Sequence, residues 1–362
     1  MIVIGTNGIA EGLFRNFELV RRHIMFFARH HTTRKFINLC SLYLQRYTKR
    51  HVLSAKPIEV IIEPTNICQL RCPLCPTGQR TNLRPAGMMK WETFQKIIDE
   101  LAPWLYKVRL YNWGEPLIHP DIFRMIRYAQ SKNISTELSS HLNTLGQSGS
   151  KELIESGLEL LILSLNGIDS ETYSKYHISG VLEKACSNIK SVIEARKKLN
   201  AKYPIVEIQF LIMRHNEEQL SEMIRLADSL GVDRLRFGPV TINVKNQSDW
   251  QWLPKNEKFS RYLYHQKKDK IYSYRKQCEW LWRSAVFNWD GTVSPCCVYE
   301  GPRSVIGSII EQPFLKIWNN EKYVDSRRIF KHSDNRIQKA QSNCIKCQGM
   351  PFAADENQHG LY

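Results

Sequence analysis

Short apolar runs alternate with segments of helical periodicity from Ile58 onward, the pattern of a parallel sheet whose strands are joined by crossover helices. Six runs have the length of strands, and they cover residues 58–63, 107–111, 135–140, 158–165, 206–213 and 234–237. Helical periodicity falls near residues 90–101, 121–132, 150–156, 182–200 and 217–230. The pattern predicts an α/β fold of six strand-helix units, which are too few for a full eight-stranded barrel.

The segment before Ile58 combines positive charge with helical patterns. Residues 1–57 hold ten Lys or Arg, against Glu11 and Glu18 as the only acids. Apolar residues at spacings of four and three predict an amphipathic helix, and they are Leu13, Phe17, Val20, Ile24 and Phe27. A second helix is expected over residues 34–47. This basic extension either packs along the barrel and covers its open side, or it binds an acidic partner or an anionic membrane surface. No nucleic-acid recognition module is recognisable in it.

Composition narrows the setting of the protein. The formal net charge is +16 and 43% of the residues are hydrophobic. No run of 18 apolar residues occurs, and the N-terminus lacks the basic-then-apolar layout of a signal peptide. The expected compartment is the cytoplasm, where thiols stay reduced. Clustered cysteines among the 10 in the chain are therefore better explained by metal binding than by disulfides.

Three cysteines on the loop after the first strand are the most specific chemical feature. Cys68, Cys72 and Cys75 form a Cys-x3-Cys-x2-Cys run. Thiolates this close together suit an iron-sulfur cluster, and a set of three leaves one iron open for a substrate or cofactor. A structural zinc site is an alternative, but such a site usually pairs two Cys-x2-Cys units that are close in sequence.

Polar motifs follow the next three strands, at the strand ends where parallel barrels carry their chemistry. They are Tyr-Asn-Trp-Gly-Glu-Pro at 111–116, Glu-Leu-Ser-Ser-His-Leu-Asn at 137–143 and Leu-Ser-Leu-Asn-Gly at 163–167. Turn formation and helix capping also explain Ser and Asn residues at such places, so both interpretations stay open.

The cysteine run and these motifs together resemble those of the radical S-adenosylmethionine (radical SAM) enzymes. The resemblance covers residues 58 to about 239 and implies a partial (β/α)6 TIM-like barrel. It implies that Cys68, Cys72 and Cys75 hold a 4Fe-4S cluster whose fourth iron binds S-adenosylmethionine. One electron from a reduced cluster of this kind cleaves S-adenosylmethionine to methionine and a 5′-deoxyadenosyl radical. A flavodoxin- or ferredoxin-type electron donor is implied as a partner.

The resemblance also assigns contacts to S-adenosylmethionine. They are Gly114 and Glu115 for the methionyl ammonium, Ser139 and Asn143 for the ribose, Ser164 for the carboxylate and Leu74 for the adenine. Trp113 replaces the first glycine of the family's Gly-Gly-Glu element. The family usually has an aromatic residue in place of Leu74, so apolar packing on adenine survives here while ring stacking does not.

A second set of cysteines lies near the C-terminus. Cys278 is followed after twelve residues by Gly291 and after four more by Cys296, and Asp290-Gly291 predicts the turn of a hairpin over residues 285–294. This layout resembles the SPASM and twitch appendages, which carry auxiliary 4Fe-4S clusters. The implied ligands are Cys278, Cys296, Cys344 and Cys347, with Cys297 as the competitor of Cys296. A zinc ribbon is the alternative. No cysteine follows Cys347, so a second auxiliary cluster is not expected. Cys40 and Cys186 fit ordinary helical positions.

The predicted division of the chain is a basic helical extension (1–57), the partial barrel (58–239), a linker rich in Trp and Tyr (240–277) and an auxiliary-cluster domain (278–362). The leading hypothesis is an oxidoreductase that removes a hydrogen atom from a small polar metabolite of sugar or aminocyclitol type, with the auxiliary cluster taking the second electron. Radical modification of a peptide, and a non-enzymatic zinc-stabilised binding protein, are the alternatives. The sequence does not identify the proton acceptor, and the candidates near strand ends are Tyr111, His119, His141, Gln209 and Arg236.

Overall fold

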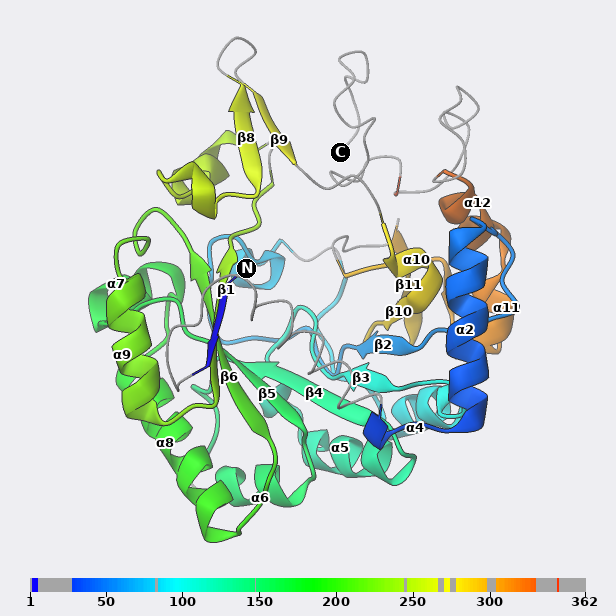
Figure 1. Ribbon diagram of the computed structural model, residues 1–362, viewed down its shortest axis with the longest axis horizontal. Helices are drawn as coiled ribbons and strands as arrows, with labels where there is room; N and C mark the ends of the chain where they lie inside the picture. Colours follow the sequence, from blue (N-terminus) through cyan, green and yellow to red (C-terminus); the bar gives the residue numbers. More distant parts are fainter. Residues whose placement is uncertain are drawn as a thin grey trace.

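Six parallel strands form the centre of the structure, a computed structural model that describes residues 2–5, 28–81, 84–146, 148–243, 246–265, 270–273, 278–297, 304–329 and 344. They lie side by side in chain order, and they are β2 (Glu59–Ile62), β3 (Lys107–Arg109), β4 (Ser135–Ser140), β5 (Leu160–Ser164), β6 (Ile205–Ile212) and β7 (Arg234–Pro239). Each falls within or beside a run predicted as a strand. The curved arrangement in Figure 1 confirms the predicted partial barrel.

Helices cover the outer face of this curved sheet (Figure 1). They are α4 (Trp91–Leu101), α5 (Ile122–Ser131), α6 (Gly149–Glu155), α8 (Leu182–Lys198) and α9 (Leu220–Leu230), with the short α7 (Ser170–Tyr176) before α8. Alternate strand residues such as Val108, Leu138 and Phe210 are fully buried and belong to the same apolar core as Phe94 and Ile126 of the helices. Burial of this apolar surface is the main force that holds sheet and helices together.

The sheet continues past the barrel strands at both edges, which the sequence did not predict. At one edge, β1 (Ile2–Gly5) pairs antiparallel with β7, so that Val3 lies opposite Arg236. At the other edge, β10 (Ser284–Phe287) pairs parallel with β2, so that Val286 lies opposite Ile61. The C-terminal hairpin is therefore part of the barrel sheet. Neither pairing has a local sequence signal, because each joins segments far apart in the chain.

The C-terminal hairpin was predicted over residues 285–294, and β10 is followed there by β11 (Thr292–Ser294) and then by β12 (Gly307–Ser308). Its turn is longer than the two residues expected from Asp290-Gly291. The Asn288 amide donates to the Thr292 carbonyl over 2.8 Å, and the Gly291 amide donates to the Asn288 carbonyl over 2.9 Å. Gly291 has a φ of 81°, the left-handed conformation that closes a three-residue hairpin loop.

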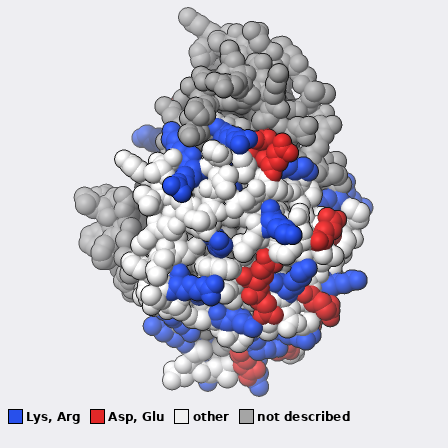
Figure 2. Space-filling view, turned by 90° about the vertical axis from the view of Figure 1, so that its right-hand side faces the viewer, with Lys and Arg blue, Asp and Glu red and all other residues white. Residues whose placement is uncertain are grey.

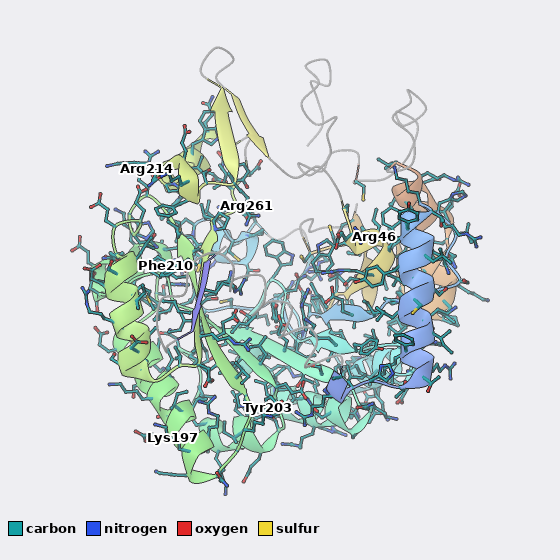
Figure 3. All side chains as sticks on the ribbon, in the orientation of Figure 1. Arg46, Lys197, Tyr203, Phe210, Arg214 and Arg261 are labelled. Carbon is teal, nitrogen blue, oxygen red and sulfur yellow. The ribbon has the colours of Figure 1, made fainter. Side chains whose placement is uncertain are left out.

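Residues 28–57 of the basic extension connect the barrel to the C-terminal part. Its helix α2 (Thr33–Tyr47) matches the predicted second helix, and Arg46 extends from it to Glu279 over 2.5 Å (Figure 3). The Trp318 indole donates to the carbonyl of Ala55 over 2.9 Å. The predicted first helix, Leu13 to Phe27, lies outside the described residues.

The Trp- and Tyr-rich linker contains more structure than its irregular pattern indicated. A 3-10 segment covers Gln247–Trp252, and β8 (Tyr262–His265) pairs antiparallel with β9 (Lys270–Ser273). Tyr262 is buried in a second apolar cluster, and Trp250 and Trp252 pack against that cluster. Beyond the linker, α10 (Trp280–Arg283), α11 (Phe314–Trp318) and α12 (Glu321–Arg328) surround the hairpin.

Candidate active site

The three cysteines of the first set lie on the loop that leaves β2. Cys75 caps the short helix α3 (Pro76–Gln79), and its backbone amide donates to the Cys72 carbonyl over 3.1 Å, so the second and third cysteines share one turn. The side chains of Cys68, Cys72 and Cys75 are all partly buried. This turn places Cys72 and Cys75 next to each other on the loop.

The thiols of this loop are costly to ionise without a cation. Burial raises the pKa of Cys72, and the neighbouring Cys75 and Cys68 raise it further. Burial also raises the pKa of Cys75, although hydrogen bonds from the backbone of Gly78 and Thr77 act against this increase. Iron binds thiolates, so the positive charge of a cluster would offset the burial and the repulsion that keep Cys72 and Cys75 protonated. The chemistry of the three thiols therefore fits an iron-sulfur cluster.

A cluster and a single metal ion place different demands on the thiols. Each cysteine of a 4Fe-4S cluster binds a different iron, so the sulfur atoms need not converge on one point. Among the residues that the structure describes, no three His, Cys, Asp or Glu side chains are grouped around the position of one metal ion.

Two glycines allow the loop to pack tightly. A Cβ on Gly78 would lie 2.4 Å from the backbone nitrogen of Cys72, and a Cβ on Gly114 would lie 2.1 Å from the carbonyl oxygen of Thr65. The Glu115 amide also donates to the carbonyl of Ile67 over 2.9 Å. The predicted Gly-Glu element after β3 thus lies directly against the cysteine loop, with no room for a side chain between them.

Glu115 is 2% exposed, and its carboxylate connects this element to the end of β4. Oε1 accepts from the Ser140 hydroxyl over 2.8 Å and from the Leu117 amide over 3.1 Å. Oε2 accepts from the His141 amide over 3.2 Å and lies 3.0 Å from the imidazole Nε2 of His141. These four contacts occupy the acceptor positions of a carboxylate. The predicted role of Glu115 as acceptor of the methionyl ammonium would require one of them to be exchanged.

His141 forms an ion pair with Glu115 next to the first cysteine. Burial alone would raise the pKa of Glu115, but His141 and the hydrogen bonds of Ser140 and Leu117 outweigh burial and hold it below its usual value. Burial lowers the pKa of His141, yet Glu115 and Cys68 together raise it to about 9. Nε2 of His141 is 3.8 Å from Sγ of Cys68. The sequence had offered His141 only as one possible proton acceptor.

The other residues predicted to contact S-adenosylmethionine differ in whether their side chains already form hydrogen bonds within the protein. Ser139 and Ser164 are half-buried near the ends of β4 and β5, and within the described part of the chain their hydroxyls form no hydrogen bond. The Asn143 amide group donates to the Tyr173 hydroxyl over 2.9 Å, and its oxygen accepts from the Val181 amide over 2.7 Å. Asn143 thus holds the segment before α8 in place.

Leu74 and a group of residues that the sequence did not indicate form an apolar cluster beside the cysteine loop. Leu74 and Cys72 pack against its buried members, which are Tyr176, Met213, Val240, Ile242 and Tyr262. Nδ1 of His177 lies 3.6 Å from Sγ of Cys72, and burial lowers the pKa of His177 to about 3, so this imidazole is neutral. These residues come from strand ends, from the end of α7 and from the linker, and have no shared sequence pattern, so only the fold brings them together.

The inner face of the barrel is polar and partly accessible. Along β3 and the two residues after it, buried and half-buried side chains alternate. Val108 and Leu110 face the helices and are fully buried, whereas Arg109 and Tyr111 are half-buried. The same difference separates the buried Ile208 of β6 from its neighbour, the half-buried Gln209, and Arg236 of β7 is also half-buried. Alternate strand residues face opposite sides of a sheet, so the half-buried set lines the interior.

Ion pairs and hydrogen bonds join these inner residues. The Tyr111 hydroxyl donates to Oε1 of Glu137 over 2.5 Å, and Arg109 lies 3.5 Å from the same carboxylate and 3.0 Å from Glu59. Burial and then Glu137 raise the pKa of Tyr111 well above its usual value, while Arg109 and Arg236 act in the opposite direction. Residues of β3, β4 and β7 thus act on one another electrostatically inside the barrel.

The remaining candidate acceptors occupy different settings. His119 is buried, and its ring nitrogens contact the Met89 carbonyl at 2.9 Å and the Asp121 amide at 3.1 Å, which places it in the support of the loop before α5. Arg236 donates to Glu207 over 2.6 Å and to Gln209 over 2.6 Å. Tyr111, Gln209 and Arg236 therefore lie on the barrel's inner face, and His119 does not.

Three cysteines of the second set act electrostatically on Tyr323 of α12. Tyr323 is fully buried, and burial raises the pKa of its hydroxyl above its usual value, with further contributions from Cys296, Cys344 and Cys278. Cys297 instead contributes to the pKa of Arg109 on the barrel's inner face. Cys347 lies outside the described residues.

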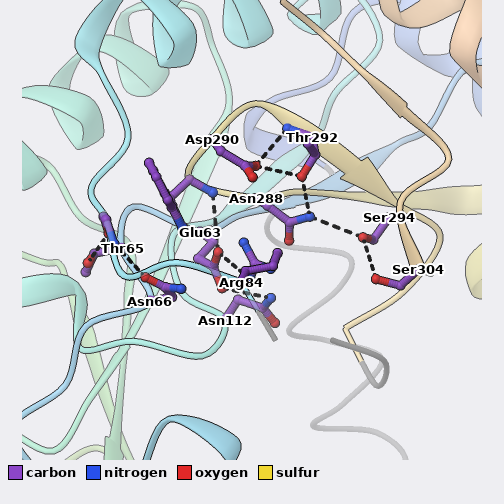
Figure 4. Close-up of polar contacts among 12 residues, drawn as sticks. Glu63, Thr65, Asn66, Arg84, Asn112, Asn288, Asp290, Thr292, Ser294 and Ser304 are labelled. Carbon is purple, nitrogen blue, oxygen red and sulfur yellow. Dashed lines mark hydrogen bonds and ion pairs between the residues drawn. The ribbon is translucent and has the colours of Figure 1, made fainter. Parts of the chain in front are cut away.

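A buried polar network links the cysteine loop to the C-terminal hairpin (Figure 4). The two carboxylate oxygens of Glu63 accept from NH2 of Arg84, Oε1 over 3.0 Å and Oε2 over 2.8 Å. Oε1 also accepts from the side-chain amide of Asn112 over 3.3 Å. The backbone amide of Trp289, in the hairpin turn, donates to Oε2 of Glu63 over 3.3 Å. One carboxylate therefore connects the start of the cysteine loop to the hairpin that precedes Cys296.

Comparison with known families agrees with this geometry. Residues 62–243 match the model of the radical SAM superfamily, which is half of the chain. The chain belongs to the radical SAM superfamily. Residues 278–348 match the SPASM iron-sulfur cluster-binding domain. A radical SAM protein with a SPASM domain uses a S-adenosylmethionine-binding 4Fe-4S cluster, S-adenosylmethionine and auxiliary iron-sulfur chemistry, as the sequence had indicated. None of the described helices is long and apolar enough to cross a membrane.

Curated relatives of this radical SAM protein have diverse names. The tungsten-containing aldehyde ferredoxin oxidoreductase cofactor-modifying protein of Pyrococcus furiosus is 25% identical over 301 residues, which are 75% of this chain and 83% of the relative. The AdoMet-dependent heme synthase of Methanosarcina barkeri is 28% identical over 47% of this chain and 46% of its own length. The PqqA peptide cyclase of Granulibacter bethesdensis is 26% identical over 51% and 47%. The chain thus spans most of the first relative and less than half of the other two.

Solved radical SAM structures share the fold. Streptococcus suis SuiB bound to S-adenosylmethionine superposes with a TM-score of 0.62 at 15% identity, covering 96% of this chain and 80% of SuiB. Native anSMEcpe with bound AdoMet and the Cp18Cys peptide gives a TM-score of 0.56 at 16% identity, covering 78% and 86%. At these identities the likeness concerns the fold alone.

Proposed function

We propose that this radical SAM enzyme acts on a polar substrate held inside the barrel, and that a net two-electron oxidation of a small polar metabolite is the reaction. The half-buried inner face formed by Arg109, Tyr111, Gln209 and Arg236 carries this proposal. A polar lining favours a substrate with hydroxyl, amino or carboxylate groups, because an apolar substrate would displace water from these polar groups without offering hydrogen bonds in its place.

Within this proposal Cys68, Cys72 and Cys75 hold the cluster. When bound, the cluster and S-adenosylmethionine supply a 5′-deoxyadenosyl radical. The uncommitted hydroxyls of Ser139 and Ser164 bind polar groups of S-adenosylmethionine, and Leu74 presents the apolar cluster to its adenine.

Glu115 has a different part in the proposal from the one first expected. Because four protein donors already surround its carboxylate, it fixes the loop of Gly114 against the cysteine loop. The backbone carbonyl oxygens of this turn then accept from the methionyl ammonium. Asn143 similarly supports the site, because its side-chain oxygen accepts a hydrogen bond from the Val181 amide and holds that segment. The same oxygen contacts the ribose by accepting a second hydrogen bond.

The auxiliary cluster belongs to the C-terminal part. We assign Cys278, Cys296, Cys344 and Cys347 as its ligands, because the first three act together on Tyr323 whereas Cys297 acts on Arg109. The family matches, residues 62–243 and 278–348, support the proposed division into a barrel (58–239), a linker (240–277) and an auxiliary domain (278–362) after the extension (1–57). A reduced flavodoxin or ferredoxin is the proposed electron donor.

Anaerobic reconstitution with iron and sulfide tests the proposal. About eight irons per chain are expected, four for each cluster, together with 5′-deoxyadenosine once a strong reductant is added. Cys72→Ala should abolish this cleavage, whereas Cys344→Ala should leave part of it and impair product formation. Tightly bound zinc without cleavage would refute the enzyme reading, and full product formation by Cys344→Ala would refute a redox role of the auxiliary cluster.

Radical modification of a peptide is the second candidate, and it is favoured by the PqqA peptide cyclases among the curated relatives. Substrate binding can be detected as faster release of 5′-deoxyadenosine. Sugars and aminocyclitols should increase this rate if the first proposal holds. An increase with a pool of synthetic peptides, and none with the small metabolites, would establish the second candidate instead.

A further inference from the structure

Helix α2 exposes a stripe of apolar residues to solvent. Five large apolar side chains of this helix are about half exposed or more, and they are Phe36 (50%), Ile37 (62%), Tyr43 (49%), Leu44 (64%) and Tyr47 (88%). Their positions recur at intervals of three and four, so they form one stripe along the helix together with the exposed Cys40. A surface helix of a globular protein normally turns such a stripe toward the core.

The opposite side of α2 packs on the protein through Leu42 and is fixed there by specific polar bonds. Nζ of Lys35 donates to the Asn133 carbonyl over 2.5 Å. Asn38 exchanges two hydrogen bonds with the backbone of Lys56, at 2.8 and 3.0 Å. Gln45 accepts from the Ser54 amide over 2.9 Å. Rotation of the helix would break these bonds, so its orientation with the apolar stripe outward is built into the fold.

Positive charge surrounds this stripe. The sequence contains no acidic residue between Glu18 and Glu59, whereas Arg34, Lys49 and Arg50 on and after α2 are all exposed. The guanidinium of Arg34 lies 4.9 Å from the ring centre of Trp104 beside the helix. Figure 2, which faces the side of the molecule where α2 lies in Figure 1, shows a broad area without charge, and Lys and Arg side chains predominate over the acidic side chains that stand among them around it.

We propose that this face of α2 docks on the surface of an anionic lipid bilayer. An apolar stripe of aromatic and aliphatic side chains can enter the boundary between headgroups and acyl chains, while neighbouring Lys and Arg side chains reach the lipid phosphates. The helix has fifteen residues, about 22 Å, and lies flat on such a surface. A second copy of the chain fits this face less well, because a symmetric dimer would place two positively charged surfaces against each other. The proposal is independent of the proposed reaction.

Sedimentation of the reconstituted holoenzyme with vesicles tests the proposal. Vesicles of phosphatidylglycerol and phosphatidylcholine should bind the protein, and vesicles of phosphatidylcholine alone should bind it far more weakly. Ile37→Ser with Leu44→Ser should reduce the partition coefficient about 30-fold through lost apolar burial. Lys49→Gln with Arg50→Gln should reduce it about 25-fold, since each cation near an anionic surface contributes about fivefold.

Matched controls separate docking from general attraction to a basic protein. Lys197→Gln with Lys198→Gln, and Leu199→Ser, change exposed residues at the end of α8, far from α2 in Figure 3. They should alter binding less than threefold. If the α8 charge variant weakened binding as much as the α2 charge variant, or if Ile37→Ser with Leu44→Ser bound as the wild type does, the docking face would be refuted. A dimer in analytical ultracentrifugation that these α2 substitutions dissociate would assign the face to a second copy instead.

Discussion

Oε2 of Glu63, at the end of the first barrel strand, accepts a hydrogen bond from the backbone amide of Trp289 in the turn of the C-terminal hairpin. The Glu63 side chain is completely buried and is paired with Arg84, whose side chain is 5% exposed. One buried ion pair thus supports both the cysteine loop and the hairpin that precedes Cys296.

Glu63→Gln should therefore lower the free energy of unfolding by about 3 kcal/mol, because it removes the buried carboxylate that pairs with the Arg84 guanidinium. Urea unfolding of the apo-protein measures this change. Glu155→Gln is the control, since Glu155 forms only an exposed pair with Lys151, and it should change stability by less than 0.5 kcal/mol. Equal effects of the two substitutions would contradict the importance assigned to the buried pair.

Gly114→Ala should prevent correct assembly of the cysteine loop. The added methyl group would lie 2.1 Å from the Thr65 carbonyl oxygen. Because this oxygen belongs to the backbone, the clash is relieved only if the backbone itself moves. We expect a loss of stability above about 3 kcal/mol and about four irons per chain in place of about eight, measured by iron analysis after reconstitution. At Gly146 a Cβ has no neighbour within 4 Å, so Gly146→Ala should retain the wild-type iron content. Normal iron loading of Gly114→Ala would refute the tight packing.

Cys296 and Cys297 should differ in their effect on the auxiliary cluster. Cys296→Ser should reduce the iron content toward about four per chain, and Cys297→Ser should leave it near eight, because Cys296 acts on Tyr323 as Cys278 and Cys344 do, whereas Cys297 acts on Arg109. Electron paramagnetic resonance of the reduced proteins distinguishes the loss of one cluster from partial loss of both. The reverse result would make Cys297 the ligand.

Lys35 should give stability a characteristic dependence on pH. Burial lowers its pKa from 10.5 to about 8 in the folded protein, so between these values the unfolded chain binds more protons than the folded one. Stability contributed by this group therefore rises with pH from about 8 to about 10.5, by at most about 3 kcal/mol. Lys35→Met should lack the increase. The free energy of unfolding is measured with urea at pH 7.5 and pH 10 for both proteins, and its change with pH is compared between them. This comparison removes the contribution of buried tyrosines and cysteines, which titrate in the same range in both proteins. No difference would contradict the low pKa.

The parts of the fold that were predictable from sequence are those with a local signal. The six strands and their helices alternate in period, and α2 has a stripe of apolar residues, so each could be placed to within a few residues. The same stripe misleads about orientation, because the residues of α2 that face the protein are Lys35, Asn38, Leu42 and Gln45, only one of which is apolar. Local patterns predict that a helix forms, but specific bonds to distant segments decide which side is buried.

The candidate site divides in the same way. The motifs at Cys68 to Cys75 and at Gly114-Glu115 are short and specific, so they could be read directly. The contact of His141 with both Glu115 and Cys68, and the apolar cluster around Tyr176, depend on how strand ends meet in space. The pairing of β10 with β2 could not be predicted from the sequence either, since it joins two segments that are far apart in the chain.

That pairing has a consequence for biosynthesis. While the chain is being made, the barrel strands β2 to β7 leave the ribosome well before β10, so the edge of β2 has no partner on that side until the C-terminal part emerges. Unpaired strand edges promote aggregation. A chain cut after residue 243 should therefore be poorly soluble even though it holds the whole radical SAM match, and the C-terminal hairpin serves the barrel as the strand that completes its edge.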